Sequence, residues 1–599
     1  MHIKKIIMVV LLLLILIGCT KQSTVPPLSE SRQQKIPAIH EEYNDNEFSV
    51  IVVGSDPEGI SAAIAAARAG GKVLLIDKRD KVGGLFTLGW LNFLDMNYNK
   101  NKVLVTQGIF KEFYKQIEGI AFSIKTADKV FNNLLSKEKN ITLMLNMNDI
   151  KPQLKDNKII GITANNNNEE YTYFCNTLID ATQDGDIAAL AGAPFTLGYE
   201  DIGGAKFGMA VTQVFSLKGM TNKGWSKLRK HLKNDGDKYS SSTNNTAWGF
   251  KNFNKLYKPI NKNAELRGPN FAREPDGRIM INALRIFQIN PLDPISIESA
   301  KQIAKQEIAE IIPFFREQVP GMENIKLDAI APELYIRESR HFVTEYRLTI
   351  TDVLENRDQE DRIALGSYPV DMQGTAPKTY ALILGNPNQY AIPFRSLVPL
   401  NIDNLLIVGR SAGFDSLAHG SARMVPVGMC TGEAAGVAAI IAKNNNVNVR
   451  ALSKDSTLVK SLQDQLINNG AYLPEFEIKD KFLNHKYYTG ISFIRQYALV
   501  CGNYNNDYLV DRIINTGEYN WLVQEIVKRR ELTLEGEYLP CKTVKDLQKT
   551  DINNSFANNP KLLTYLNSLE IYQQTTEDEF ISIGKMATLL YHIDEYLNK

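Results

Sequence analysis

Early in the chain, the apolar pattern predicts a strand, a tight turn, a helix and a second strand. Residues 48–53 form a continuous apolar run rich in β-branched residues, as expected for a buried parallel strand. A turn with two glycines follows over residues 54–59, and small residues over 60–70 predict a closely packed helix. Residues 72–76 then form a short apolar strand, closed by Asp77. This order is typical of a dinucleotide-binding βαβ unit.

Three residues of this unit have the chemistry needed to hold a dinucleotide, and one does not. Gly54 allows the tight turn, and Gly59 lets the helix pack closely against the strand. The helix N-terminus can bind a pyrophosphate, and Asp77 can accept hydrogen bonds from an adenosine ribose. Asp56 stands where the G-x-G-x-x-G pattern has its middle glycine, and a carboxylate that points inward would repel phosphate. We expect nucleotide binding; the alternative is a purely structural βαβ unit.

Two later apolar strands extend the pattern. The run 177–180 breaks at small and acidic residues around Ala181 and Asp184. Much further along, the run 404–408 leads through Gly409 into a glycine-rich segment that predicts another helix. A nucleotide fold that resumes after so long an interruption favours a flavin, because a nicotinamide dehydrogenase does not need it.

These segments, in this order, resemble the FAD-dependent oxidoreductase family of bacterial flavoproteins, within the glutathione-reductase-like superfamily. Residues 335–341, 364–371 and 390–399 carry the same resemblance, which covers residues 48–443. Members of the superfamily that bind FAD covalently have a histidine directly after a pair of glycines. Here Leu85 follows Gly83-Gly84, so the resemblance implies noncovalent FAD. No second G-x-G-x-x-G unit is present, so an internal nicotinamide domain is not expected.

The resemblance implies an α/β fold with a discontinuous, Rossmann-like FAD-binding domain made of residues 48–200 and 395–443. Residues 201–394 should form an inserted α+β substrate or cap domain over the flavin. Within it, the apolar pattern predicts a helix from Ser299 to about Ile312 that Pro313 stops. The implied cofactor-binding residues are Gly54, Ser55, Asp56, Gly59, Asp77, Lys78, Gly83, Gly84, Ala181, Asp184, Gly409, Arg410, Gly420, Ser421 and Gly428.

Four residues are candidates for the chemistry. His419 precedes Gly420-Ser421 beside the expected flavin strand, so we predict an acid/base or flavin-contact role; the alternative is a structural, hydrogen-bonded histidine. Arg337, Arg340 and Arg423 could bind a carboxylate or balance the charge of reduced flavin. For each arginine, an ion pair with a nearby acid is an equal alternative.

The N-terminus has the pattern of an export signal. Two lysines precede an apolar run over residues 6–17, which is too short to span a bilayer comfortably. Residues 16–19 resemble a bacterial lipoprotein lipobox, which implies acylation of Cys19 after removal of residues 1–18; an ordinary signal peptide is the alternative. Residues 19–46 then read as a flexible tether. Two acyl chains on Cys19 would suffice for stable membrane attachment.

The C-terminal region has a different pattern. Residues 450–599 are aromatic and charged with helical periodicity, and we predict a mostly helical region. Residues 504–523 weakly resemble an S-layer-homology repeat, which implies a cell-wall polymer as a partner; a plain helical extension is the alternative. Cys501 and Cys541 could pair or remain two separate thiols. No CxxC is present, so we predict neither a metal site nor thioredoxin-like chemistry.

The near-zero net charge of the chain argues against nucleic acid as a partner, and charge and composition exclude little else. Removal of residues 1–18 takes away two lysines and no acidic residue, so 68 basic and 67 acidic residues become 66 and 67. The resemblance, together with the N-terminal pattern, implies an exported, membrane-anchored bacterial FAD-dependent oxidoreductase that acts on a small organic substrate. Two alternatives stay open: a surface polysaccharide-binding protein that retains FAD, and a lyase or isomerase that uses FAD without net redox change.

Overall fold

The computed structural model describes residues 46–167, 169–206, 208–250, 255–379 and 381–598. The predicted signal segment, Cys19 and nearly all of the predicted tether lie outside the described residues.

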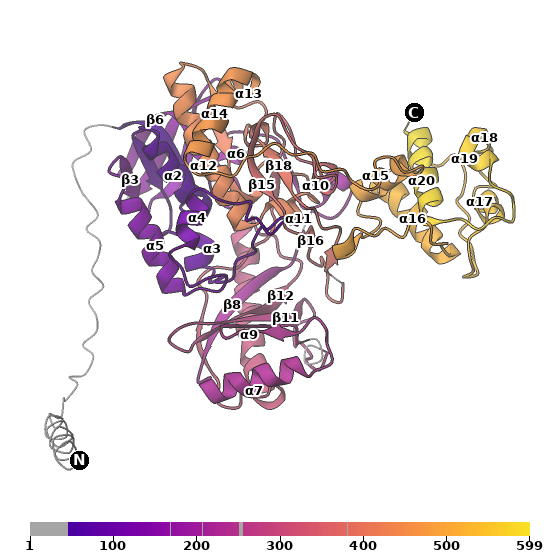
Figure 1. The fold of residues 1–599 in the computed structure, drawn as a ribbon, viewed down its shortest axis with the longest axis horizontal. Coiled ribbons are helices and arrows are strands. Elements are labelled where there is room, and N and C mark those ends of the chain that lie inside the picture. The colour runs from indigo at the N-terminus through magenta and orange to yellow at the C-terminus, as the bar shows by residue number, and fades with distance from the viewer. Residues whose placement is uncertain (1–45, 168, 207, 251–254, 380, 599) are drawn as a thin grey trace, which may run out of the picture. The chain divides into compact units, whose positions relative to one another are not determined.

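A seven-stranded sheet forms the centre of a mixed α/β fold (Figure 1). Its order is β3-β2-β1-β6-β5-β4. β5 pairs with the first part of β6, and β19 pairs in parallel with the last residues of β6. β1, β2, β3, β6 and β19 run parallel, whereas β4 and β5 form an antiparallel extension. The bounds are Glu47–Val53 (β1), Val73–Ile76 (β2), Ile141–Met144 (β3), Asn148–Lys155 (β4), Lys158–Asn166 (β5), Glu169–Asp180 (β6) and Leu405–Ile407 (β19).

The first strand is apolar from Val50 to Val53 because both of its faces are covered there. Side chains alternate between the faces of a strand. Val50 and Val52 belong to the core that contains helices α2 (Pro57–Arg68) and α12 (Val425–Asn444), whereas Ile51 belongs to the core on the opposite face. This burial on both sides is what the continuous apolar run predicted.

Helices α2 and α12 touch along their backbones. A side-chain carbon on Gly432 would lie 2.2 Å from the Glu58 carbonyl oxygen, and one on Gly436 would lie 2.2 Å from the Ala62 carbonyl oxygen. α12 is the one helix in the described part of the chain that is long and apolar enough to cross a membrane, and 89% of its most apolar window is buried within the protein. Its apolar surface is therefore used in this packing.

A second, six-stranded sheet has the order β13-β8-β12-β11-β10-β9 and is antiparallel. In sequence it falls between β6 and β19. Helices α7 (Asn222–Lys233) and α9 (Pro294–Gln318) share one core with it (Figure 1). The strand bounds are Val211–Lys218 (β8), Ser241–Ser242 (β9), Thr246–Trp248 (β10), Ala264–Arg273 (β11), Ile279–Ile286 (β12) and Lys326–Ile330 (β13).

The predicted stop of helix α9 at Pro313 is wrong, because α9 continues to Gln318 with this proline inside it. An interior proline costs about 3 kcal/mol. Ile311, Ile312 and Phe315 on the same stretch are buried in the second core, and each contributes about 1.5–3 kcal/mol by burial. Packing of the last turns therefore outweighs the lost backbone hydrogen bond.

The C-terminal region is helical, as predicted. Helices α13 and α14 adjoin α12 in the first core, and the later helices form a core of their own. Hydrogen bonds join this region to the preceding part, including Tyr488 to Glu355 at 2.6 Å. Cys501 and Cys541 are free thiols. The bounds are Val449–Lys454 (α13), Ser456–Asn468 (α14), Tyr488–Gln496 (α15), Thr516–Arg529 (α16), Lys549–Ser555 (α17), Pro560–Ser568 (α18), Glu570–Gln573 (α19) and Ile583–Leu597 (α20).

Further helices and short strands complete the described part of the chain. They are α3 (Gly84–Thr87), α4 (Ile109–Tyr114), α5 (Ile124–Ser136), α6 (Asp186–Leu190), β7 (Phe195–Leu197), η1 (Glu200–Ile202), β14 (Arg340–Phe342), α10 (Ile350–Leu354), β15 (Arg362–Gly366), β16 (Asp371–Met372), β17 (Leu382–Ile383), β18 (Tyr390–Pro393), η2 (Phe394–Leu397), η3 (Gly409–Ser411), α11 (His419–Ala422) and η4 (Asn503–Asn505).

Candidate active site

A cavity of about 540 Å³ lies at the carboxyl ends of β1, β2 and β6. We call it the loop cavity. In open parallel sheets, ligands bind at this edge. Its walls include the predicted residues Gly54, Asp56, Asp77, Lys78 and Asp184.

The two outer glycines of the turn act as predicted. Gly54 has a φ of +101°, and a side chain there would lie 2.5 Å from the Ala181 carbonyl oxygen. A side chain on Gly59 would lie 2.0 Å from the Gly54 carbonyl oxygen. Only glycine allows these contacts between β1, α2 and the end of β6.

Asp77 is buried and holds the turn in place. One carboxylate oxygen accepts hydrogen bonds from the Ser55 N–H and the Ser55 hydroxyl, both at 2.6 Å. The other accepts a hydrogen bond from the Arg79 N–H at 2.9 Å. Asp77 therefore fixes the turn and lines the loop cavity at the same time.

The Asp56 carboxylate points inward, and its charge is compensated. Arg79 forms an ion pair with it at 2.5 Å, and the Leu85 N–H donates to it at 3.1 Å. A side chain on Gly84 would lie 1.7 Å from this carboxylate, so glycine at position 84 leaves the space for Asp56. The positive charge of Arg79 thus compensates the negative charge of Asp56, which would otherwise repel the phosphate groups of a nucleotide.

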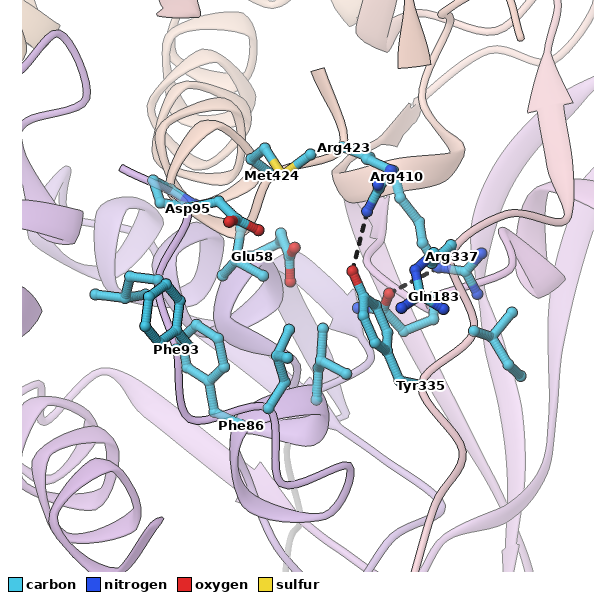
Figure 2. A pocket seen from close by; sticks show the side chains of 16 residues that line it. Glu58, Phe86, Phe93, Asp95, Gln183, Tyr335, Arg337, Arg410, Arg423 and Met424 are labelled. Atoms are coloured by element: carbon cyan, nitrogen blue, oxygen red, sulfur yellow. Dashed lines mark hydrogen bonds between the residues drawn. The ribbon is translucent and has the colours of Figure 1, made fainter. Parts of the chain in front are cut away.

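A narrow slot of about 20 Å³ shares the lining residue Gln183 with the loop cavity, and Figure 2 shows the side chains that line this slot. We call it the central slot; its walls include Glu58, Gln183, Tyr335, Arg337, Arg410 and Arg423. Arg410 pairs with Asp184 at 2.6 Å, and its Nε donates to Gln183 at 2.9 Å. The predicted residues Asp184 and Arg410 therefore join the ends of β6 and β19.

Glu58 is the residue of the slot that the sequence analysis missed. Gly428, and less closely Gly409, lie against its side chain, and its Oε2 is buried without a hydrogen-bond partner in the described residues. Burial, and then the Asp56 charge, raise the pKa of Glu58 to about 8. At neutral pH the side chain is therefore mostly a neutral acid that can donate a hydrogen bond. The position of Glu58 inside the glycine-rich turn, residues 54–59, is the sequence feature that could have identified it as a site residue.

A third cavity, of about 200 Å³, lies between the slot and the second sheet. We call it the sheet cavity. Its walls include Arg267, Asn282 and Arg285 from the second sheet. It shares Leu91, Phe93, Asp95, Tyr335, Arg337 and Arg423 with the central slot.

Two of the predicted arginines meet at this shared wall. Arg423 Nη1 donates to the Tyr335 hydroxyl at 3.0 Å (Figure 2). Its Nη2 lies 3.6 Å from the Asp371 carboxylate. The Arg337 guanidinium lies over the Tyr335 ring, 4.1 Å from its centroid. Positive charge therefore gathers where the slot and the sheet cavity join.

Asp95 lies at the same junction. The Tyr368 hydroxyl donates to its carboxylate at 2.8 Å. Burial raises the pKa of Asp95, and this hydrogen bond and Arg423 partly oppose the rise. A half-buried carboxyl group that has a raised pKa and lines two cavities is suited to accept or donate a proton.

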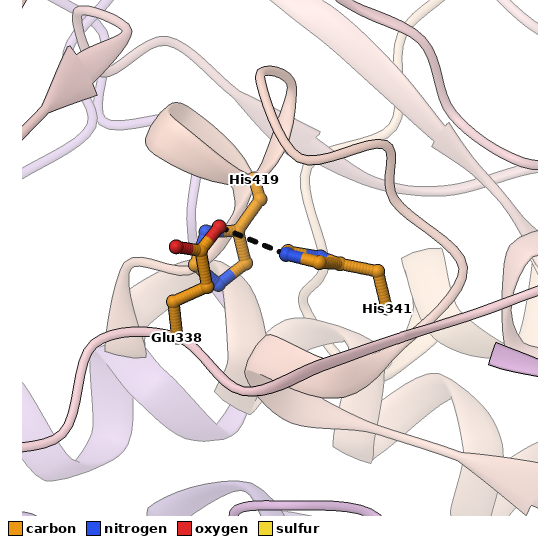
Figure 3. A group of neighbouring side chains, drawn as sticks. All are labelled: Glu338, His341 and His419. Atoms are coloured by element: carbon orange, nitrogen blue, oxygen red, sulfur yellow. Dashed lines mark hydrogen bonds and ion pairs between the residues drawn. The ribbon is translucent and has the colours of Figure 1, made fainter. Parts of the chain in front are cut away.

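His419 lies apart from these cavities and lines none of the three. Its ring packs edge-on against His341 at 4.7 Å between centroids, and His341 Nε2 lies 2.9 Å from Glu338 (Figure 3). Burial, and then His341, Arg423 and Arg410, lower the pKa of His419 well below its usual range.

The buried group Glu338, His341 and His419 brings one possible metal-ligand atom from each residue within 4.8 Å of the others. Glu338 already uses both oxygens, because the second accepts the Met209 N–H at 2.9 Å. The positive charge of Arg423 and Arg410 also opposes a cation here. Glu338 and His341 share a hydrogen bond, whereas the Nδ1 atoms of His341 and His419 are buried without a hydrogen-bond partner in the described residues.

The other predicted residues divide between the loop cavity and supporting positions. Arg340 pairs with Asp186 at 2.8 Å and lines the loop cavity. Ser421 accepts from the Tyr390 hydroxyl at 2.7 Å and donates to the Tyr368 carbonyl at 2.6 Å, and neither it nor Gly420 lines the three cavities. The Gly83 N–H donates to the Ser55 carbonyl at 2.7 Å.

The family model described as "FAD dependent oxidoreductase" matches residues 49–466, which is more than half of the chain. This chain belongs to the FAD-dependent oxidoreductase family. It is accordingly a flavoenzyme, and its cofactor is FAD.

The chain is also similar to curated proteins and to solved structures. Thiamine thiazole synthase of Pyrococcus horikoshii is 30% identical over 142 residues, which are 21% of this chain and 53% of that protein. The chain thus spans about half the length of the curated relatives it matches. A geranylgeranyl bacteriochlorophyll reductase-like protein of Thermoplasma acidophilum is 12% identical, with a TM-score of 0.37, over 71% of this chain and 84% of that chain. The myxobacterial chondrochloren halogenase CndH is 12% identical, with a TM-score of 0.35, over 76% and 90%.

The residues of this FAD-dependent oxidoreductase fit the cofactor. The loop cavity and Asp77 suit the adenosine end, and the compensated Asp56 removes the main obstacle to the pyrophosphate. The unpartnered Oε2 of Glu58 offers a hydrogen bond within the central slot. At about 20 Å³, the slot is smaller than a flavin ring system.

Proposed function

We propose that this FAD-dependent oxidoreductase oxidises or reduces a small organic substrate bound in the sheet cavity. One observation carries the proposal: the sheet cavity and the central slot share a wall that contains Asp95, Tyr335, Arg337 and Arg423. A substrate on one side of this wall meets the cofactor site on the other. The six-stranded sheet then serves as an inserted cap on a glutathione-reductase-like FAD-binding domain.

The residues at the wall have separate tasks. FAD, when bound, accepts or supplies the electron pair. Asp95 takes up or returns the substrate proton, because its raised pKa brings its titration closer to neutral pH. Arg337 and Arg423 stabilise negative charge that develops between the two sites. Phe93 and Leu91 contribute apolar surface that keeps water from the reacting atoms.

The test is the visible flavin absorption of the purified protein under anaerobic conditions. A panel of small alcohols, amines, organic acids and their unsaturated counterparts is added to the oxidised and to the dithionite-reduced protein. Loss or return of flavin absorption with at least one compound supports the proposal. Compounds that bind and are converted with no change in flavin oxidation state identify a lyase or isomerase instead, and polysaccharide binding alone identifies a surface-binding protein.

We also propose that the protein is exported and anchored to the bacterial membrane through a lipid on Cys19. The support is the basic start, the apolar run and the Leu-Ile-Gly-Cys sequence at residues 16–19. Metabolic labelling with a fatty acid tests it. Label in the wild type and none in Cys19→Ser supports the anchor, whereas equal labelling contradicts it.

A further inference from the structure

The wall that the second sheet contributes to the sheet cavity is rich in positive charge. Arg267 and Arg285 come from this sheet, and Arg337 and Arg423 lie on the wall shared with the central slot. The acidic residues on the cavity walls are Asp95 and Asp371. Arg423 lies 3.6 Å from Asp371, and Arg267 lies 3.7 Å from Glu265.

Arg285 differs from Arg267 and Arg423, because within the described residues no carboxylate lies within 4.0 Å of its guanidinium; the same holds for Arg337, whose Nη1 instead donates to the Ala210 carbonyl and the Thr212 hydroxyl. The side chain of Arg285 is buried, with 8% of the residue exposed, and its Nη1 has no hydrogen-bond partner in the described residues. A buried guanidinium group without a partner carries a large desolvation cost. Burial, and then the charge of Arg337, lower the pKa of Arg285 to about 10. An anion in the cavity would relieve both effects.

The strand register places a second arginine next to it. Thr212 on β8 is the cross-strand partner of Arg285 on β12, and Arg337 Nη1 donates to the Thr212 hydroxyl at 2.8 Å. Two arginines therefore flank one hydroxyl group. Asn270 and Asn282, which are cross-strand partners on β11 and β12, add two amides to the cavity wall.

We propose that Arg285, together with Arg337, binds a carboxylate group of the substrate in the sheet cavity. This rests on the proposed function, because it takes the sheet cavity as the substrate site. A guanidinium fork matches a planar carboxylate with two parallel hydrogen bonds. Asp95 and Asp371 on the same walls disfavour the higher charge of a phosphate. The substrate is therefore a small organic acid whose carboxylate lies between Arg285 and the wall shared with the slot, to which Arg337 belongs.

The test is calorimetric titration of the FAD-loaded protein with acetate, succinate and citrate, and with the neutral diamide of succinate. We expect saturable binding of at least one acid, no binding of the diamide, and weaker binding as salt rises. Arg285→Gln should weaken binding of that acid by at least about tenfold, because a charged hydrogen bond is lost. Arg285→Lys, which keeps the charge, should lose less.

Lys223→Gln is the matched control, because Lys223 is an exposed cation on α7 and its loss changes the net charge equally. It should bind the acid as the wild type does. Binding of none of the acids, equal binding by Arg285→Gln and the wild type, or tighter binding of inorganic phosphate than of every acid would each overturn the proposal. Flavin reduction by a neutral compound in a protein that binds no acid would overturn it and leave the proposed function standing.

Discussion

The pKa of Glu58 predicts a pH-dependent stability that one substitution should remove. Burial raises this pKa from its usual 4.5 to about 8 in the folded protein. One pKa unit corresponds to about 1.4 kcal/mol, so ionising Glu58 costs about 5 kcal/mol more in the folded protein than in the unfolded chain. Because the folded pKa is raised, this contribution to stability is complete below pH 4.5 and is lost as the pH rises through 8.

Glu58→Gln keeps the shape and has no charge to bury. The variant and the wild type should therefore have similar free energies of unfolding near pH 4.5. At pH 8 and above, the variant should be more stable by up to about 5 kcal/mol. Other buried acids also have raised pKa values, including Asp180 at about 6 and Glu433 at about 7, so the difference between the two proteins is the informative quantity.

The assay is urea unfolding of the flavin-free proteins from pH 5 to pH 9, followed by tryptophan fluorescence. Glu317→Gln is the control, because Glu317 is an exposed acid on α9 and its replacement should not change the slope with pH. A stability difference between Glu58→Gln and the wild type that stays constant over this range would refute a buried, neutral Glu58. So would a variant that becomes less stable relative to the wild type as pH rises.

Further predictions concern the cofactor turn and the shared wall. Gly54→Val should abolish flavin binding, because Gly54 has a φ of +101° and its side-chain position lies 2.5 Å from the Ala181 carbonyl oxygen; retained stoichiometric flavin in the purified variant would contradict this. Arg79→Gln should weaken FAD binding by at least about tenfold by leaving Asp56 unpaired, and Asp56→Asn in the same chain should restore much of it, as measured by FAD titration. Asp95→Asn should keep FAD and slow its reduction by substrate at least about a hundredfold in rapid mixing, whereas unchanged kinetics would exclude Asp95 as the proton acceptor. His419→Ala should also keep FAD; the sequence predicts slower flavin reduction, which unchanged kinetics would contradict.

The sequence predicted the nucleotide-binding part of this protein well, because its signals are local. Continuous apolar strands, the positions of Gly54 and Gly59, and the acid after β2 each depend on neighbouring residues. Such patterns translate directly into buried strands and a tight turn. The resemblance also implied that two segments distant in sequence lie side by side. In the structure β19 pairs with β6, and α12 packs against α2.

The wall shared by the central slot and the sheet cavity was only partly predictable. Arg337 and Arg423 were named from the sequence, and Tyr335 stands in the segment 335–341 that carries the resemblance. Asp95 carries no local pattern, and the four residues become neighbours only through the fold. The compensation of Asp56 by Arg79 likewise depends on side-chain directions around the turn. The continuation of α9 through Pro313 depends on burial against the second sheet, which local propensity does not contain.

The central claim is that substrate reaches the flavin from the sheet cavity. The most direct measurement is anaerobic flavin reduction by an active compound in the wild type and in Asn282→Trp, which fills this cavity from β12. We predict that the variant binds FAD and is bleached by dithionite like the wild type, but is bleached by the compound far more slowly. Equal rates of reduction by the compound in the two proteins would contradict the account.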